Sequence, residues 1–211
     1  MIILHLNNWD SPDTFRLSTD FDFFDALQGI LLSPFAHSTD NHLINNVVPL
    51  FFLMSLITYV FDSFAYVLFL LFYFLTGLFI WRFASILDPS IPYHSVIGAS
   101  GVLYAMVSFL FFSGLIRRNR ELLGYSLLIV FLYGSMVWGM FPFSVKDNVS
   151  WEAHLMGFIV GFILALVLRK IGPQKKVYEW EDEEDEYKED EYKEDEYKED
   201  EYKEDEYKED E

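Results

Sequence analysis

The chain of 211 residues contains no cysteine, which excludes disulfides, thiolate nucleophiles and zinc sites built from cysteine. Basic residues are also scarce, with 15 Lys and Arg against 33 Asp and Glu. Residues 179–211 hold 22 of the acids and 5 lysines, a charge of −17, so residues 1–178 carry only −1. An acidic chain of this kind is not expected to bind nucleic acid. The nearly neutral body is rich in Phe, Leu, Ile and Val, which is typical of membrane proteins.

The acidic tail is a low-complexity segment. The pentapeptide EYKED occurs five times in succession between Glu186 and Asp210. Such a segment has too little apolar surface to offset the entropy of ordering, so we expect a disordered tail over residues 171–211. The remainder is expected to comprise an outer loop region over residues 1–41 and a membrane domain over residues 42–170.

Five apolar stretches are predicted to cross a bilayer, for which a helix needs about 20 residues. They lie near residues 43–60, 64–87, 101–116, 122–141 and 152–169. We therefore expect an all-α, polytopic helical bundle that is a multi-pass protein of the cell membrane. Basic residues follow the third stretch at 117–120 and the fifth at 169–176. The positive-inside rule then predicts a cytoplasmic C-terminal tail and, with five crossings, an N-terminus outside.

One serine stands between two glycines at the head of the third stretch, in the segment SVIGASGVLYAM. Ser100 to Ile116 spans about 25 Å of helix, whereas the hydrocarbon core is about 30 Å thick. If the basic residues hold the inner end at the interface, Ser100 lies several ångströms below the outer surface. The N–H groups of a helix N-terminus can stabilise an oxyanion there, although small residues also suit close helix packing.

Two other stretches place polar side chains at the same depth. His154 lies about one turn into the fifth stretch, and Gly157 and Gly161 after it form a small-xxx-small pair. An ionisable residue within a membrane is a functional candidate by default, although a lone histidine is often a packed polar group. His42 and Asn46 share one helical face in the first stretch, and both side chains can donate N–H bonds to an oxyanion. Helix capping would not explain Asn46.

Together these motifs resemble the rhomboid family of intramembrane serine proteases, over roughly residues 30–170. The match has three parts. The first is G-x-S-G at 98–101, with Tyr104 four residues after the serine, and the second is H-x-x-x-N at 42–46, preceded by His37. The third is H-x-x-G-x-x-x-G at 154–161. The catalytic core of the family usually has six spans. We expect the first of these helices to be absent here, because residues 1–36 resemble the loop that comes after it.

The resemblance implies a catalytic Ser-His dyad. Ser100 would be the nucleophile and His154 the general base, and no third carboxylate would take part. The implied oxyanion hole consists of His42, Asn46, Gly98 and the backbone N–H of Ser100. Supporting positions are Tyr104, which would stack on the ring of His154, and Gly157, Gly161 and His37.

The expected function is therefore serine endopeptidase activity on transmembrane protein substrates within the lipid bilayer, with no cofactor and no metal. The fourth stretch is expected to open sideways to substrates, because Gly124, Gly134 and Gly139 weaken it, and residues 142–150 would roof the site. The alternative is an inactive relative that binds membrane helices and directs their fate. Such relatives usually lack the serine or the histidine. A transporter is disfavoured because the chain has no internal repeat and few intramembrane charges.

Overall fold

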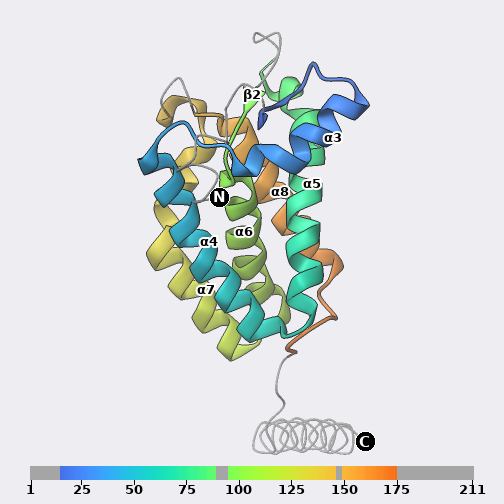
Figure 1. Ribbon diagram of the computed structural model, residues 1–211. Helices are drawn as coiled ribbons and strands as arrows, with labels where there is room; N and C mark the ends of the chain where they lie inside the picture. The colour runs from blue at the N-terminus through green and yellow to red at the C-terminus, as the bar shows by residue number, and fades with distance from the viewer. Residues whose placement is uncertain (1–14, 89–94, 146–148, 175–211) are drawn as a thin grey trace, which may run out of the picture. The chain divides into compact units, whose positions relative to one another are not determined.

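A computed structural model describes residues 15–88, 95–145 and 149–174. The segment MIILHL at the start of the chain, and residues 175–211 of the tail predicted over 171–211, lie outside the described residues. The elements, in chain order (Figure 1), are β1 (Leu17–Ser18), α3 (Phe23–Leu32), η1 (Ser33–Phe35), α4 (Asp40–Phe61), α5 (Phe64–Leu87), β2 (Ser95–Val96), α6 (Ser100–Arg117), α7 (Arg120–Tyr133), η2 (Gly134–Met140), η3 (Pro142–Ser144) and α8 (Trp151–Val167).

Each of the five predicted crossings coincides with a helical segment. Helices α4, α5 and α6, and α7 together with η2, are long and apolar enough to cross a membrane, whereas α8 is an apolar helix of 17 residues. The fourth crossing differs from the continuous helix expected over 122–141. Its α-helix ends at Tyr133, and the chain continues from Gly134 as the 3₁₀ helix η2. Glycine is a poor helix former, which accounts for a change of helix type at this position.

Helix α6 forms the centre of the bundle. In its most apolar window 67% of the residues are buried, against 17–33% in the other three long spans. Figure 1 shows α4 and α7 on one side of α6, with α5 and α8 on the other. Phe109 of α6 packs against Phe61 of α4 and Phe72 of α5, with both ring-centroid distances at 5.3 Å. The helix that begins with Ser100 is therefore held on several sides.

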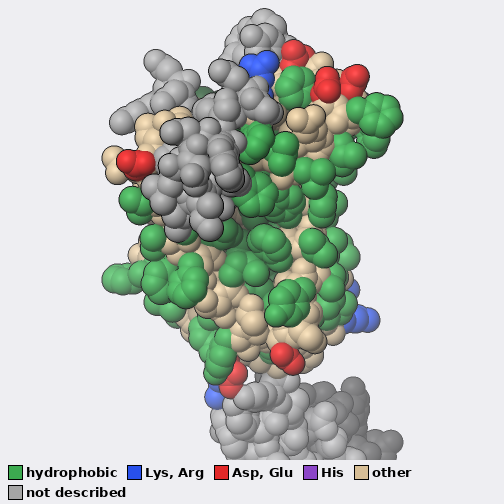
Figure 2. All heavy atoms as spheres, in the orientation of Figure 1, with side chains coloured by type: hydrophobic (Ala, Val, Ile, Leu, Met, Phe, Trp, Pro, Cys, Tyr) green, Lys and Arg blue, Asp and Glu red, His purple; other side chains and the backbone are tan. Residues whose placement is uncertain are grey.

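The outer surface of the bundle is apolar. Phe51 of α4 is 68% exposed and Phe131 of α7 is 85% exposed. Figure 2 shows hydrophobic side chains over the middle of the face in view, with charged side chains toward the two ends. In water a continuous apolar surface of this kind would be strongly unfavourable, whereas lipid chains solvate it. The surface therefore fits a protein that crosses a membrane several times.

The segment that leads into α6 is fixed by backbone hydrogen bonds. Strands β1 and β2 pair in antiparallel register, with Leu17 opposite Val96. Two residues after β2, the N–H of Gly98 donates to the carbonyl of Ser33 at 2.7 Å. These bonds tie the start of α6 to the segments around α3, and thereby position Ser100.

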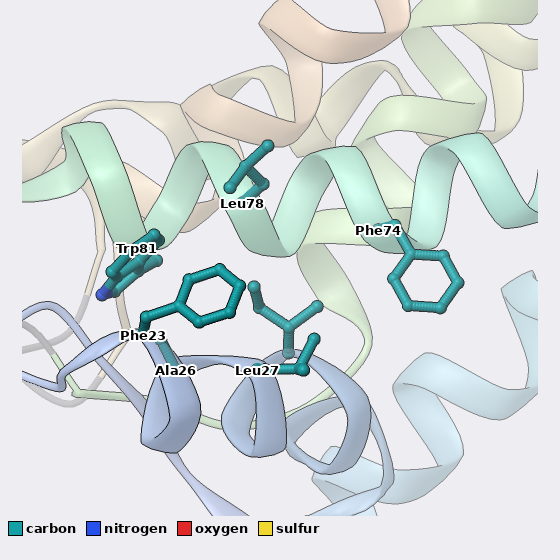
Figure 3. Close-up of a pocket in the computed structure, with 7 residues that line it drawn as sticks. Phe23, Ala26, Leu27, Phe74, Leu78 and Trp81 are labelled. Carbon is teal, nitrogen blue, oxygen red and sulfur yellow. The ribbon is translucent and has the colours of Figure 1, made fainter.

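A shallow apolar pocket lies between α3 and α5, as Figure 3 shows. Its lining consists of Phe23, Ala26, Leu27, Ile30, Phe74, Leu78 and Trp81. The indole N–H of Trp81 donates to the carbonyl of Phe21 at 3.1 Å and so ties α5 to the start of α3. No titratable side chain is among these lining residues, so the pocket offers no acid–base chemistry.

Arg117 marks the opposite end of α6 from Ser100. Its side chain is only 6% exposed, and its Nη2 donates to the carbonyl of Leu168 at 2.9 Å. The guanidinium also lies 5.0 Å from the ring centroid of Phe61. Arg117 therefore joins the ends of α4, α6 and α8 about 25 Å from Ser100, taking 1.5 Å per helical residue.

Candidate active site

Ser100 and His154 lie in direct contact although 54 residues separate them in the chain. Ser100 is the first residue of α6, and His154 lies in the first turn of α8. The Oγ atom of Ser100 is 2.9 Å from Nε2 of His154. The expected meeting of a hydroxyl and an imidazole from two non-adjacent helices is therefore present. The imidazole is 9% exposed, so bulk water is largely kept from it.

Glycines on α8 allow this contact, because they let the helix lie directly against α6. A Cβ atom at Gly157 would overlap the carbonyl oxygen of Gly101, and one at Gly161 would overlap that of Ala105. The hydroxyl of Ser108 on α6 also donates to the carbonyl of Phe158 at 2.7 Å. Gly157 and Gly161 thus allow close helix packing, which brings His154 within hydrogen-bonding distance of Ser100.

The second ring nitrogen of His154 faces a backbone carbonyl. Nδ1 lies 2.8 Å from the oxygen of Gly139 in η2. A carbonyl oxygen can only accept, so Nδ1 carries the proton and a neutral ring has its lone pair on Nε2. That lone pair faces the hydroxyl of Ser100. Glu152, a buried carboxylate two residues before His154, accepts from the Ser150 hydroxyl at 2.9 Å.

Tyr104 packs against one face of the imidazole ring of His154. The two rings are stacked, with centroids 4.3 Å apart and an interplanar angle of 11°. The hydroxyl of Tyr104 donates to the carbonyl of Met136 at 2.7 Å, so Tyr104 is itself fixed to η2. The imidazole therefore has one orientation, set by a stacking partner on α6 and an acceptor on η2.

Donor side chains from α4 lie over the turn before Ser100. Gly98 has a φ of +90°, and a Cβ atom there would lie 2.6 Å from Nε2 of His42 and 3.6 Å from Nδ2 of Asn46. Only glycine adopts this backbone conformation without strain and leaves this space. The fold therefore brings His42, Asn46 and Gly98 together close to Ser100. The N-cap of α6 is Ala99, whose side chain cannot accept from the first N–H groups of the helix.

Hydrogen bonds orient the two donors of α4. The amide Nδ2 of Asn46 donates to the carbonyl of His42 at 2.9 Å, which leaves its second N–H directed elsewhere. The hydroxyl of Ser38 lies 3.4 Å from Nδ1 of His42. His37 is 2% exposed, and its ring meets that of His42 edge-on at 4.9 Å between centroids. The polar cluster of α4 is thus built from side chains that support one another.

The carbonyls of Gly139 and Met136 belong to the candidate site, and motif spacing does not reveal them. Every residue type carries a backbone carbonyl, so no residue pattern indicates which one will meet the imidazole of His154. The only local signal is the glycine at position 139, which the sequence by itself suggests is a weak point of the fourth crossing. Among the residues described, no group of three His, Asp or Glu side chains is arranged to hold a metal ion.

Comparison with known proteins supports a family assignment. A family model described as the Rhomboid domain matches residues 25–171. Uncharacterized proteins of Mycobacterium bovis and Mycobacterium tuberculosis are each 30% identical over 154 residues, which cover 72% of this chain and 62% of theirs. An uncharacterized protein of Mycobacterium leprae is 31% identical over 155 residues, which cover 72% of this chain and 59% of that protein. The chain thus spans about three fifths of the curated relatives it matches. No solved structure matches it significantly.

Proposed function

Because this chain belongs to the rhomboid family, we propose that it is an intramembrane serine endopeptidase that cleaves transmembrane substrate helices. The observation that carries this proposal is the 2.9 Å contact between Ser100 and Nε2 of His154, inside an apolar helical bundle. A hydroxyl becomes a useful nucleophile when a correctly oriented base takes its proton. The arrangement around His154 provides that orientation.

The reaction follows the acyl-enzyme route. Oγ of Ser100 attacks the scissile carbonyl carbon while its proton passes to Nε2 of His154. The imidazolium then returns the proton to the leaving amine, and the peptide bond breaks to leave an ester on Ser100. A water molecule, deprotonated by His154, hydrolyses this ester and regenerates the serine. The proton on Nδ1 stays on the imidazole throughout and is donated in a hydrogen bond to the Gly139 carbonyl.

The negative oxygen of the tetrahedral intermediate is stabilised by donors on two elements. The N–H groups at the start of α6 point along the helix axis with a partial positive charge. His42 and Asn46 of α4 lie beside Gly98 and supply side-chain N–H groups. A His42 ring that accepts from Ser38 at Nδ1 carries its proton on Nε2, which is the atom beside Gly98. This donor set supports a role as an oxyanion hole.

The site opens toward the outer leaflet in this proposal. Arg117 and Arg118 stand at the end of α6 opposite Ser100, and Arg120 begins α7 at that same end. The positive-inside rule assigns that end to the cytoplasm. The C-terminal tail is then cytoplasmic, and the N-terminal segment lies outside.

Helix α7 and η2 are the proposed entrance for substrate helices. The outward face of α7 carries exposed apolar side chains such as Leu127 (71% exposed) and Phe131 (85% exposed), so lipid or a substrate helix can lie against it. A Cβ atom at Gly124 would meet no atom within 4 Å. This segment is the least buried of the long spans, so it can be displaced at a lower free-energy cost than α5 or α6.

A fluorophosphonate probe tests the proposal without knowledge of the natural substrate. We expect the purified protein in detergent to be labelled, and Ser100→Ala and His154→Ala to abolish both labelling and cleavage of transmembrane peptides in liposomes. Ser55→Ala is the matched control, because that hydroxyl donates to the carbonyl of Phe51 within α4, away from the site. If the probe labelled Ser100→Ala as fast as the wild type, the protease assignment would be wrong. A folded wild type that resists labelling and cleaves no peptide would favour the non-enzymatic role.

A further inference from the structure

We propose that the η2 carbonyl of Gly139 is the positioning group that completes the catalytic site, so that the dyad is assembled only while η2 is docked against α6 and α8. The inference rests on the proposed function and extends it. It assigns to the substrate entrance a second task, which is to hold the base.

Two hydrogen bonds link η2 to the base and its support. The Gly139 carbonyl lies 2.8 Å from Nδ1 of His154, and the Met136 carbonyl accepts from the Tyr104 hydroxyl at 2.7 Å. A 3₁₀ helix has three residues per turn, so carbonyls three positions apart lie on the same edge of it. Because η2 is a 3₁₀ helix, residues 136 and 139 face the same neighbours.

The carbonyl of Gly139 is available to His154 because a proline stands three positions later in the chain. In a continuing 3₁₀ helix this carbonyl would accept from the N–H of that third residue. The residue there is Pro142, which has no N–H. The preceding carbonyl, of Trp138, does accept locally, from the N–H of Phe141 at 3.2 Å. The proline thus leaves Gly139 with an acceptor directed at the base.

Glycine at position 139 is needed for the close approach. A Cβ atom there would overlap the hydroxyl oxygen of Tyr104 and would lie 3.2 Å from Nδ1 of His154. Gly134, in the same segment, differs, because a Cβ there would meet only a methyl group of Val130, at 3.8 Å. Gly139 therefore marks a contact rather than a point of flexibility, which corrects the interpretation of this glycine as a weakness.

The arrangement couples substrate entry to chemistry. A shift of η2 by about 1 Å takes both hydrogen bonds beyond the normal range of 2.7–3.2 Å. Without the carbonyl, the proton of His154 is free to move to Nε2, and this tautomer cannot accept from Ser100. A substrate helix that displaces α7 and η2 therefore meets an unassembled dyad, and cleavage waits until η2 has docked again.

The test compares two Gly→Ala variants in η2, using the rate of fluorophosphonate labelling and the kinetics of cleavage of a transmembrane peptide. We expect Gly139→Ala to slow labelling about 10- to 100-fold, part of the 10²–10⁴ that general-base catalysis contributes. Its kcat should fall while KM stays constant, because the Gly139 carbonyl acts through His154. Gly134→Ala should label like the wild type.

Two further variants separate positioning from damage to the fold. Tyr104→Phe removes the hydrogen bond to the Met136 carbonyl but keeps the ring that stacks on His154, so it should also slow labelling with the fold intact. Pro142→Ala restores an N–H that competes for the Gly139 carbonyl, and should slow labelling several-fold with the fold intact. Wild-type labelling rates in both Gly139→Ala and Pro142→Ala would overturn the inference. A wild type without Ser100-dependent labelling would instead overturn the proposed function.

Discussion

The substitution Gly157→Ala adds one methyl group to the contact between α6 and α8, next to the proposed dyad. A Cβ atom at this position would lie 2.9 Å from the carbonyl carbon of Gly101 and 3.2 Å from its Cα. Carbon atoms pack best at about 3.5–4.0 Å, so these two contacts alone require α8 to move away from α6 by roughly 0.6–1.1 Å. The overlap with the carbonyl oxygen of Gly101 requires a larger movement. His154 lies on α8 one turn before Gly157 and moves with it.

The shift has a calculable effect on the dyad. Added to the 2.9 Å between Ser100 and His154, even the smallest shift gives a distance of about 3.5 Å or more, at which a hydrogen bond is lost. We therefore expect the rate of fluorophosphonate labelling to fall by about 10²-fold or more, the lower range of general-base contributions. Overpacking of this kind should also lower the free energy of unfolding by about 1–3 kcal/mol.

Labelling rate and thermal unfolding in detergent are measured together on three variants. Gly161→Ala makes a similar overlap one turn farther from the dyad, so it should lose comparable stability but less activity. Gly124→Ala, which meets no atom within 4 Å, should leave the labelling rate unchanged and should not lower the free energy of unfolding, because alanine favours the helix. If Gly157→Ala is folded and labels as fast as Gly124→Ala, the close approach of α8 does not set the geometry of the dyad, and the reasoning fails.

Three further substitutions test separate parts of the structure. Asn46→Ala should lower kcat for peptide cleavage about 10²- to 10³-fold, because it removes a donor of the proposed oxyanion hole. Ser108→Ala removes the 2.7 Å bond to Phe158 and should lower the free energy of unfolding by about 0.6–1.7 kcal/mol. Arg117→Met removes a charged donor from the Leu168 carbonyl and should lower the free energy of unfolding by about 1.5–3 kcal/mol. The rate of fluorophosphonate labelling of the folded protein should stay unchanged.

Each of these three expectations has its own contrary outcome. Undiminished kcat in Asn46→Ala would remove this residue from the proposed oxyanion hole. Ser55→Ala is the reference for Ser108→Ala, because its bond lies within one helix, and equal stability losses would deny a special interhelical role. Slower labelling by folded Arg117→Met would mean that the far end of α6 influences the site.

Local patterns predicted the elements and most of the polar site. Runs of apolar residues indicated five crossings, and helical structure occupies each one. Four-residue spacing placed His42 and Asn46 on one face of α4, and the motif around Ser100 placed it at a helix start. These features depend on residues close together in the chain, so the sequence alone was sufficient to predict them.

The change from α7 to η2 was not predicted, because a glycine inside an apolar run is compatible with a continuous membrane helix. The identity of the acceptor for His154 was also not predictable. It is the carbonyl of Gly139, and another carbonyl, that of Ser33, holds Gly98 in place. A backbone carbonyl has no sequence signature, and its neighbours are known only once the chain is folded.

The amino-acid sequence by itself determined that this is a multi-span membrane chain with a serine, two histidines and an asparagine near one end of its helices. Hydrophobicity and helical periodicity are short-range properties, and they suffice for that result. Only the tertiary structure decided that Ser100 meets His154, and that η2 orients the imidazole. Such contacts join residues 15 to 54 positions apart, and they form because α6, α8 and η2 pack closely enough to bring these groups within hydrogen-bonding distance.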